Sequence, residues 1–189
     1  MIAKLKGIEA LNLDNEINPE IPLEYSRKRI LFIIESPSNP FLRLTDIKKL
    51  RYDYPTSKII LDFTLCGLLN GTNMISHADI SVTSCTKYIS GHNDFLGGLV
   101  ITKDEELSKS MWQYRSMAGT LVDPLSSYLL LRSLRTYDLR IAKMLYNTKK
   151  VLAFLELSNS IETIFYPGSY ANNDQEELAN NCLDHYGSL

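Results

Sequence analysis

The sequence lacks any apolar run long enough to cross a membrane. Apolar runs among its 189 residues, such as 30–34 and 128–131, are only a few residues long, far short of the roughly 18 residues that a membrane span needs. The first residues of the chain also lack an apolar stretch of the length found in signal peptides. We therefore expect a cytoplasmic protein without a membrane partner.

Cysteine is scarce, and neither sign of charge is in excess. The three cysteines, Cys66, Cys85 and Cys182, are odd in number and widely spaced, so no disulfide framework is expected. Lys and Arg number 20 and Asp and Glu number 22. Because nucleic-acid backbones select for an excess of Lys and Arg, we expect no nucleic-acid partner. The hydrophobic fraction of 44% excludes a wholly disordered chain and is typical of a globular protein.

Short apolar runs alternate with helical patterns along the chain, which predicts an α/β fold with a mostly parallel sheet. Near residue 137 the alternation gives way to a long helix, so we expect a division into residues 1–136 and 137–189. The expected strands are 8–13, 29–35, 58–63, 79–84, 97–102 and 161–166, with 29–35 buried on both faces as a continuous apolar run. The expected helices are about 45–51, 104–117, 125–134, 136–157 and 174–182, the first four of them capped by Thr45, Asp104, Asp123 and Thr136.

Polar residues follow the buried strands, where open α/β sheets bind their ligands. Asp62 lies near the end of one strand, and Ser84, Thr86 and Lys87 follow another. A lysine that attacks an aldehyde, hydroxyls that hold a phosphate and an acid that pairs with a ring nitrogen are the parts that pyridoxal phosphate (PLP) needs. Such residue types are common. From spacing alone, two alternatives therefore stay open: Asp62 as an ordinary turn residue and Lys87 as an ordinary surface lysine.

Four stretches carry a resemblance to a known enzyme family: ESPSNPFLRLTDI, ILDFTLCGLL, HADISVTSCTKYISGHNDFLGGLVI and GTLVDPLSSYLLLRSLRTYDLRI. They closely resemble the transsulfuration, or Cys/Met metabolism, family of PLP-dependent enzymes. Within the family, the first stretch and the GHNDFLGG segment look most like cystathionine γ-synthases. The resemblance implies a partial fold-type I PLP-dependent transferase domain, similar to that of aspartate aminotransferase, followed by the start of a smaller C-terminal domain.

The resemblance also implies roles for individual residues. Lys87 would form the Schiff base with the cofactor and carry protons, and Asp62 would pair with the pyridine nitrogen. Ser84 and Thr86 would hold part of the phosphate, Thr64 would lie close to the ring, and Asn39 would help to place the substrate carboxylate.

Some family features have no counterpart in this sequence. Phe63 stands where the family usually has Asn. Relative to family members, we expect the chain to start inside the cofactor domain and to stop early in the C-terminal domain. It would then lack the glycine-containing phosphate loop, the tyrosine that stacks on the ring and the arginine that grips the substrate carboxylate. The segment 25–27 (YSR) resembles one that the family borrows from a neighbouring subunit, but it lies too close to the strand at 29–35 to match.

The activity that the resemblance implies is γ-replacement on an activated homoserine ester by cysteine, giving cystathionine for methionine biosynthesis. The alternatives are a cystathionine β- or γ-lyase of the same family, and a truncated chain that is non-catalytic or serves as a partner subunit. The expected partners are small amino-acid substrates, with a homo-oligomer or a complementing chain if the protein is active.

The remaining candidate residues receive structural interpretations. Cys182 and His185 resemble half of a zinc site without a second pair, so no metal is expected. We expect Glu35 to be buried against the following helix and Cys85 to be a small packed residue. His92 should make structural hydrogen bonds. The three arginines of the helical region are expected to form a solvated helix face with ion pairs: Arg132, Arg135 and Arg140.

Overall fold

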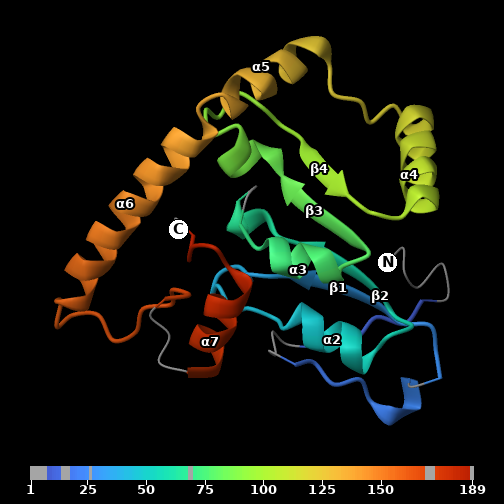
Figure 1. The fold of residues 1–189 in the computed structure, drawn as a ribbon, viewed down its shortest axis with the longest axis horizontal. Helices are drawn as coiled ribbons and strands as arrows, with labels where there is room; N and C mark the ends of the chain where they lie inside the picture. Colours follow the sequence, from blue (N-terminus) through green and yellow to red (C-terminus); the bar gives the residue numbers. More distant parts are fainter. Residues whose placement is uncertain (1–7, 14–17, 26, 68–69, 169–172, 188–189) are drawn as a thin grey trace.

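The fold is built on one four-stranded sheet. The computed structural model describes residues 8–13, 18–25, 27–67, 70–168 and 173–187. The strands lie in the order β1 (Leu31–Glu35), β2 (Lys58–Asp62), β3 (Ile80–Ser84) and β4 (Gly98–Ile101). The first three are parallel and β4 runs antiparallel to β3 (Figure 1). The predicted α/β class with a mostly parallel sheet is confirmed.

Helices of the described chain cover one face of this sheet. They are α2 (Ile47–Asp53), α3 (Thr72–His77) and α7 (Asn173–Cys182), which gather on one side of the strands in Figure 1. Phe32, Ile59 and Leu178 meet in this layer, each less than 9% exposed. Leu31 and Ile33 alternate with Phe32 and are 54% and 75% exposed. The strand that we predicted to be buried on both faces is therefore covered on one face only within the described residues.

A helical arm follows the sheet along the chain. It consists of α4 (Glu105–Ala118), α5 (Pro124–Leu134) and α6 (Tyr137–Glu156), drawn in yellow to orange in Figure 1. Asp104 caps α4 by accepting the N–H groups of residues 106 and 107, and Asp123 caps α5 by accepting that of Ser126. Both caps confirm the prediction. Thr136 occupies the N-cap position of α6 but makes no side-chain capping bond there.

The arm returns to the sheet through α6. Tyr137 and Ile141 at its start form a second core cluster with Cys85, Ile89 and Phe95, which lie just beyond β3. Helix α6 is thereby placed over the carboxyl end of β3, where the candidate site lies. The division into residues 1–136 and 137–189 stays a prediction.

Several predicted elements differ in the structure. Residues 8–13 and 161–166 form no strand, since neither segment pairs with the described sheet. The cap of α2 is Asp46, which accepts the N–H of Lys49 at 2.8 Å, whereas Thr45 is buried and donates its N–H to Ser36 Oγ. Helix α3 was not predicted at all. The helix predicted at 174–182 is confirmed as α7.

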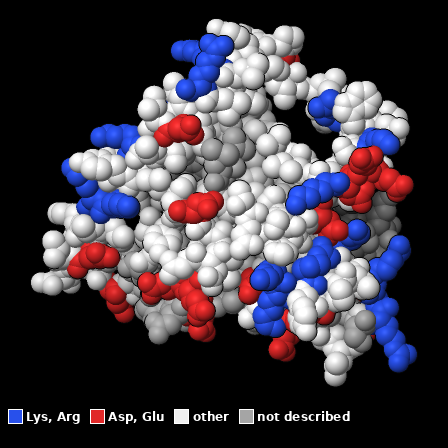
Figure 2. Space-filling view, in the orientation of Figure 1, with Lys and Arg blue, Asp and Glu red and all other residues white. Residues whose placement is uncertain are grey.

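The surface of the molecule carries both signs of charge. On the face shown in Figure 2, acidic and basic side chains are both present and neither covers the surface continuously. No helix in the described part of the chain is long and apolar enough to span a membrane.

Candidate functional site

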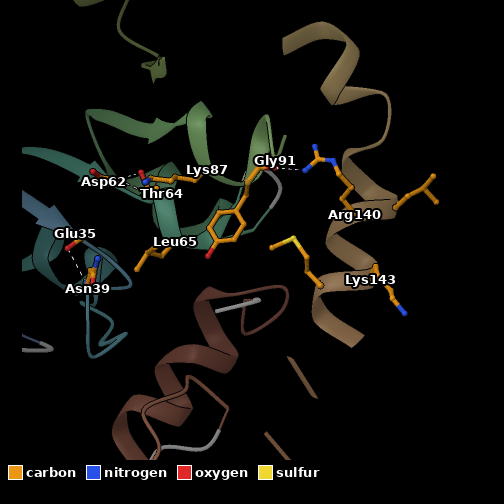
Figure 3. Close-up of a pocket in the computed structure, with 12 residues that line it drawn as sticks. Glu35, Asn39, Asp62, Thr64, Leu65, Lys87, Gly91, Arg140 and Lys143 are labelled. Carbon is orange, nitrogen blue, oxygen red and sulfur yellow. Dashed lines mark hydrogen bonds between the residues drawn. The ribbon is translucent and has the colours of Figure 1, made fainter. Parts of the chain in front are cut away.

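A pocket of about 920 Å³ lies at the carboxyl ends of the parallel strands. Its volume is in the range typical of small-molecule sites. Figure 3 shows strand-end residues on one side of the pocket and α6 on the other. The strand side contributes Glu35, Asn39, Asp62, Thr64, Leu65, Lys87, Tyr88 and Gly91, and α6 contributes Leu139, Arg140, Lys143 and Met144.

Asp62 is the last residue of β2, and its carboxylate is oriented by Thr64. The backbone N–H and the hydroxyl of Thr64 both donate to Asp62 Oδ1, at 2.9 and 2.7 Å. The same hydroxyl oxygen accepts the backbone N–H of Ser84 at 2.9 Å, so the end of β3 is tied to this pair. No described residue donates a hydrogen bond to Asp62 Oδ2, which leaves that oxygen for a partner in the pocket.

Lys87 lies in a distorted turn directly after β3. The turn is π-helical over Cys85–Ile89, and Lys87 interrupts it with φ −84° and ψ −108°. Such single π turns occur often at functional sites. The Lys87 side chain is exposed, and in Figure 3 it extends towards Asp62 and Thr64. The structure thus brings the predicted amine and the predicted carboxylate into one pocket.

Tyr88 also lines the pocket. Burial, together with the neighbouring Cys66 and Tyr137, raises the pKa of its phenol to about 12. Tyr88 is therefore a neutral hydrogen-bonding group across the physiological pH range. Its place follows from the turn after β3, and the sequence carried no signal that separated Tyr88 from other tyrosines.

Ser84 and Thr86 do not contribute to the pocket wall. The Thr86 hydroxyl donates to the Gly97 carbonyl at 3.3 Å and accepts the Gly97 N–H at 3.0 Å. This hydroxyl therefore ties the turn to the start of β4. The predicted phosphate role of both residues stays a prediction.

Asn39 does line the pocket, from the loop that follows β1. Its backbone N–H donates to Glu35 Oε2 at 3.1 Å. Glu35 is exposed and borders the pocket, so the prediction that it is buried against the following helix is wrong. The reason is its position in β1, whose alternation turns Glu35 to the same face as Leu31 and Ile33.

Arg140 is the functional candidate that the sequence analysis missed. The interpretation of Arg140 as part of a solvated face with ion pairs is wrong, because it is half-buried and donates to the carbonyls of Tyr88 and Ile89 at 2.9 and 2.8 Å. A sequence pattern could not reveal this, since the donors and acceptors are about fifty residues apart.

The other candidates have structural surroundings. The Nδ1 atom of His92 lies 2.6 Å from the Ser90 carbonyl and 3.1 Å from Ser133 Oγ. Cys85 is 3% exposed, and burial raises the pKa of its thiol, which disfavours the nucleophilic thiolate. His92 as a structural hydrogen-bonding residue and Cys85 as a packed residue agree with these surroundings. In the parts of the chain that the structure describes, no cluster of His, Cys, Asp and Glu is arranged to hold a metal ion.

Comparison with known proteins places the chain among related sequences. Over residues 1–189 it matches the model of the family described as Cys/Met metabolism PLP-dependent enzyme. A cystathionine gamma-lyase of Bacillus subtilis is 32% identical over 175 residues, which are 92% of this chain and 46% of that protein. A cystathionine gamma-synthase/O-acetylhomoserine (thiol)-lyase of the same organism is 35% identical over 137 residues, 71% of this chain and 37% of the relative.

The fold has close counterparts as well. The crystal structure of cystathionine gamma-lyase from Lactobacillus plantarum, complexed with L-serine, matches with a TM-score of 0.77 and 30% identity, over 84% of this chain and 42% of that chain. The chain therefore spans less than half the length of these relatives. Its sheet and helices correspond to part of the fold that PLP-dependent transsulfuration enzymes share.

Proposed function

We propose, because the chain belongs to the Cys/Met metabolism family of PLP-dependent enzymes, that it forms the cofactor-binding part of a transsulfuration enzyme. The proposed reaction is γ-replacement, in which an activated homoserine ester loses its γ-substituent, takes up cysteine and becomes cystathionine. One observation carries the proposal: Lys87 and Asp62 line the same pocket, and Thr64 holds one oxygen of the Asp62 carboxylate.

The pocket residues fit PLP in their chemistry. Lys87 offers a primary amine to the aldehyde, and Asp62 Oδ2 is available to accept a hydrogen bond from a protonated ring nitrogen. When bound, the cofactor withdraws the electrons that remain on the substrate after a proton is removed. Lys87 and Asp62 are thus the two residues that we assign to cofactor binding from geometry as well as from resemblance.

Lys87 has two successive tasks in this proposal. Its Nζ would hold the cofactor covalently through the aldehyde carbon, with water as the leaving group. When it is not bound to the cofactor, the same amine would take and return protons at the substrate carbons. Asp62 would lie next to the ring nitrogen, and the hydrogen bonds from Thr64 keep its carboxylate in one orientation.

The phosphate and the substrate carboxylate need further partners. We propose Ser84 and Thr86 for the phosphate and Asn39 for the carboxylate, from the family resemblance. For Thr86 this role requires its hydroxyl to exchange the Gly97 carbonyl for a phosphate oxygen. Asn39 already borders the pocket, and its side-chain amide has two N–H donors to offer a carboxylate there.

The choice between replacement and elimination is part of the proposal, because the relatives include both a synthase and a lyase. The segments ESPSNPFLRLTDI and GHNDFLGG support the synthase, and we propose methionine biosynthesis as its setting. The second candidate is a cystathionine β- or γ-lyase. A non-catalytic chain that pairs with a complementing chain is the third.

The proposed reaction suits the cytoplasm, where thiols stay reduced and free cysteine is available. In the structure Cys66, Cys85 and Cys182 are likewise free thiols. The proposed partners are amino-acid substrates and either a second copy of the chain or a complementing chain, since the described pocket supplies only part of a cofactor and substrate site.

Covalent trapping of the cofactor tests this proposal. The 189-residue chain is incubated with PLP, reduced with borohydride and digested, and the labelled peptide is identified. We expect visible absorbance before reduction and a label on Lys87, lost in Lys87→Ala and retained in Lys103→Ala, a lysine outside the pocket wall. A label on other lysines with Lys87 unmodified would contradict the proposal. Product analysis of the complemented enzyme then distinguishes the two activities. A synthase would give cystathionine, whereas a lyase would give a keto acid and ammonia.

A further inference from the structure

Arg140 on α6 connects three parts of the fold through its guanidinium. Its NH1 atom donates to the Tyr88 carbonyl at 2.9 Å, and its NH2 atom donates to the Ile89 carbonyl at 2.8 Å and the Ser133 carbonyl at 3.1 Å. Its Nε atom donates to Thr136 Oγ1 at 3.3 Å. Figure 3 shows the guanidinium reaching from α6 towards the turn that contains Lys87.

The two carbonyl oxygens nearest to the Arg140 guanidinium belong to the end of the turn over Cys85–Ile89, which contains Lys87. Within the turn, Ser90 N–H donates to the Cys85 carbonyl and Gly91 N–H donates to the Lys87 carbonyl. The carbonyls of Tyr88 and Ile89 lie in the last part of the turn. The last carbonyls of a helix have no N–H partner within the helix. A cation is favoured there, because these carbonyls carry the negative end of the turn's dipole. Arg140 therefore donates hydrogen bonds to the two carbonyls that directly follow Lys87 in the turn.

Gly91 provides the space for this contact. Its φ is +65°, and a Cβ atom at this position would lie 1.9 Å from Arg140 NH1. Any side chain at residue 91 would have to displace the guanidinium, and it would also strain the backbone. Gly91 is the first residue of the GHNDFLGG segment that carries the family resemblance, and the structure gives a physical reason for a glycine at this position.

We propose that Arg140 is a positioning residue for Lys87: it holds the turn so that the lysine amine stays in the pocket that contains Asp62. Arg140 also borders this pocket, but its guanidinium makes four hydrogen bonds within the chain, three to backbone carbonyls and one to the Thr136 hydroxyl. Its effect on the site therefore passes through the backbone that directly follows Lys87. The inference rests on the proposed role of Lys87, and its first test needs no cofactor.

The first test is hydrogen exchange of the cofactor-free 189-residue chain, comparing wild type with Arg140→Ala and with the control Arg135→Ala. Arg135 is an exposed arginine at the end of α5. In Arg140→Ala the hydrogen bonds from the guanidinium to the carbonyls of residues 88 and 89 are lost, so the turn opens more often. We therefore expect the amides of residues 88–91 to exchange at least about tenfold faster. The amides of β1 and β2 should keep their wild-type rates, and Arg135→Ala should match wild type throughout.

The second test separates positioning from a merely structural role. After incubation with PLP and reduction by borohydride, the ratio of label on Lys87 to label on Lys143, which borders the pocket from α6, is measured. We expect Arg140→Ala to lower this ratio at least about tenfold, and Arg140→Lys to recover part of it, because an ammonium keeps the charge but lacks the planar fork of donors. Gly91→Ala should change the ratio in the direction of Arg140→Ala.

The outcomes distinguish this inference from the proposed function. Unchanged exchange at 88–91 and an unchanged labelling ratio in Arg140→Ala would overturn the positioning role while leaving Lys87 as the cofactor lysine. A wild-type chain without label on Lys87 would overturn the proposed function, and the exchange of 88–91 would still decide whether Arg140 holds the turn. If Arg140→Ala does not fold, Arg140→Lys and Gly91→Ala are judged by the same measurements.

Discussion

The side chain of Gln175 pairs with the backbone of Leu44 in both directions. Gln175 Oε1 accepts the Leu44 N–H at 2.8 Å, and Gln175 Nε2 donates to the Leu44 carbonyl at 3.0 Å. Leu44 is fully buried and Gln175 is 5% exposed. Helix α7 is thus fastened to the loop between β1 and α2 by an amide that satisfies a buried peptide group.

We expect Gln175→Ala to lower the free energy of unfolding by about 2–6 kcal/mol, because each of the two buried groups left unsatisfied costs about 1–3 kcal/mol. Urea titration of the variant against wild type and Glu176→Ala, an exposed neighbour on α7, provides the measurement. Equal midpoints for all three proteins would show that the Gln175–Leu44 pair does not stabilise the fold.

The Asp62–Thr64 pair leads to a prediction about the cofactor. Asp62→Ala should abolish the visible absorbance of the bound cofactor, since the ring nitrogen loses its counter-charge. Thr64→Val, which removes the hydroxyl bond to Asp62 but keeps the backbone one, should weaken cofactor binding by about tenfold. Spectrophotometric titration with PLP measures both effects, with Glu105→Gln on α4 as a control. Wild-type affinity and spectrum in Asp62→Ala would exclude Asp62 as the ring partner.

His185 makes the C-terminal segment sensitive to pH. Its Nδ1 atom accepts the Gly187 N–H at 3.2 Å and lies 3.2 Å from Asn70 Nδ2, so two donors face this nitrogen. Burial is the main cause that lowers the pKa of His185 below its ordinary value of 6.5. A neutral His185 therefore stabilises the folded state fully above pH 6.5, and this contribution is lost as the pH falls below 6.5 towards the folded-state pKa.

We accordingly expect hydrogen exchange of residues 183–187 to accelerate between pH 7 and pH 5.5, after correction for the intrinsic rates. The acceleration should disappear in His185→Gln and persist in His77→Asn, a variant of the histidine at the end of α3. An identical pH dependence in wild type and His185→Gln would assign the effect to another group.

The activity of the 189-residue chain alone should be very low. Arg140 is the arginine of the described pocket wall, and its guanidinium already makes four hydrogen bonds within the chain, so we do not expect it to bind a substrate carboxylate. Each missing charge-assisted hydrogen bond to phosphate or carboxylate costs about 1.5–3 kcal/mol. A steady-state assay with an activated homoserine ester, cysteine and saturating PLP measures the activity. Turnover near the typical enzyme median of about 10 per second would contradict this expectation.

The sequence by itself determined the elements and site residues whose signals are local. The apolar runs at β1, β2 and β3 predicted three neighbouring strands, and the parallel arrangement then brought Asp62 and Lys87 to one edge. Asp104 and Asp123 were predicted as caps because the acceptor and the N–H groups that it binds lie within three residues.

Only the tertiary structure decided the features whose partners are distant in the chain. Residues 8–13 and 161–166 have the composition of strands, but a strand forms only where a neighbouring strand accepts its hydrogen bonds. Arg140 looked like a surface residue because the carbonyls that it binds belong to a turn about fifty residues earlier. Gln175 gave no signal either, since its partner is 131 residues away. Such contacts depend on how the helices close over the sheet, and local periodicity carries no information about that step.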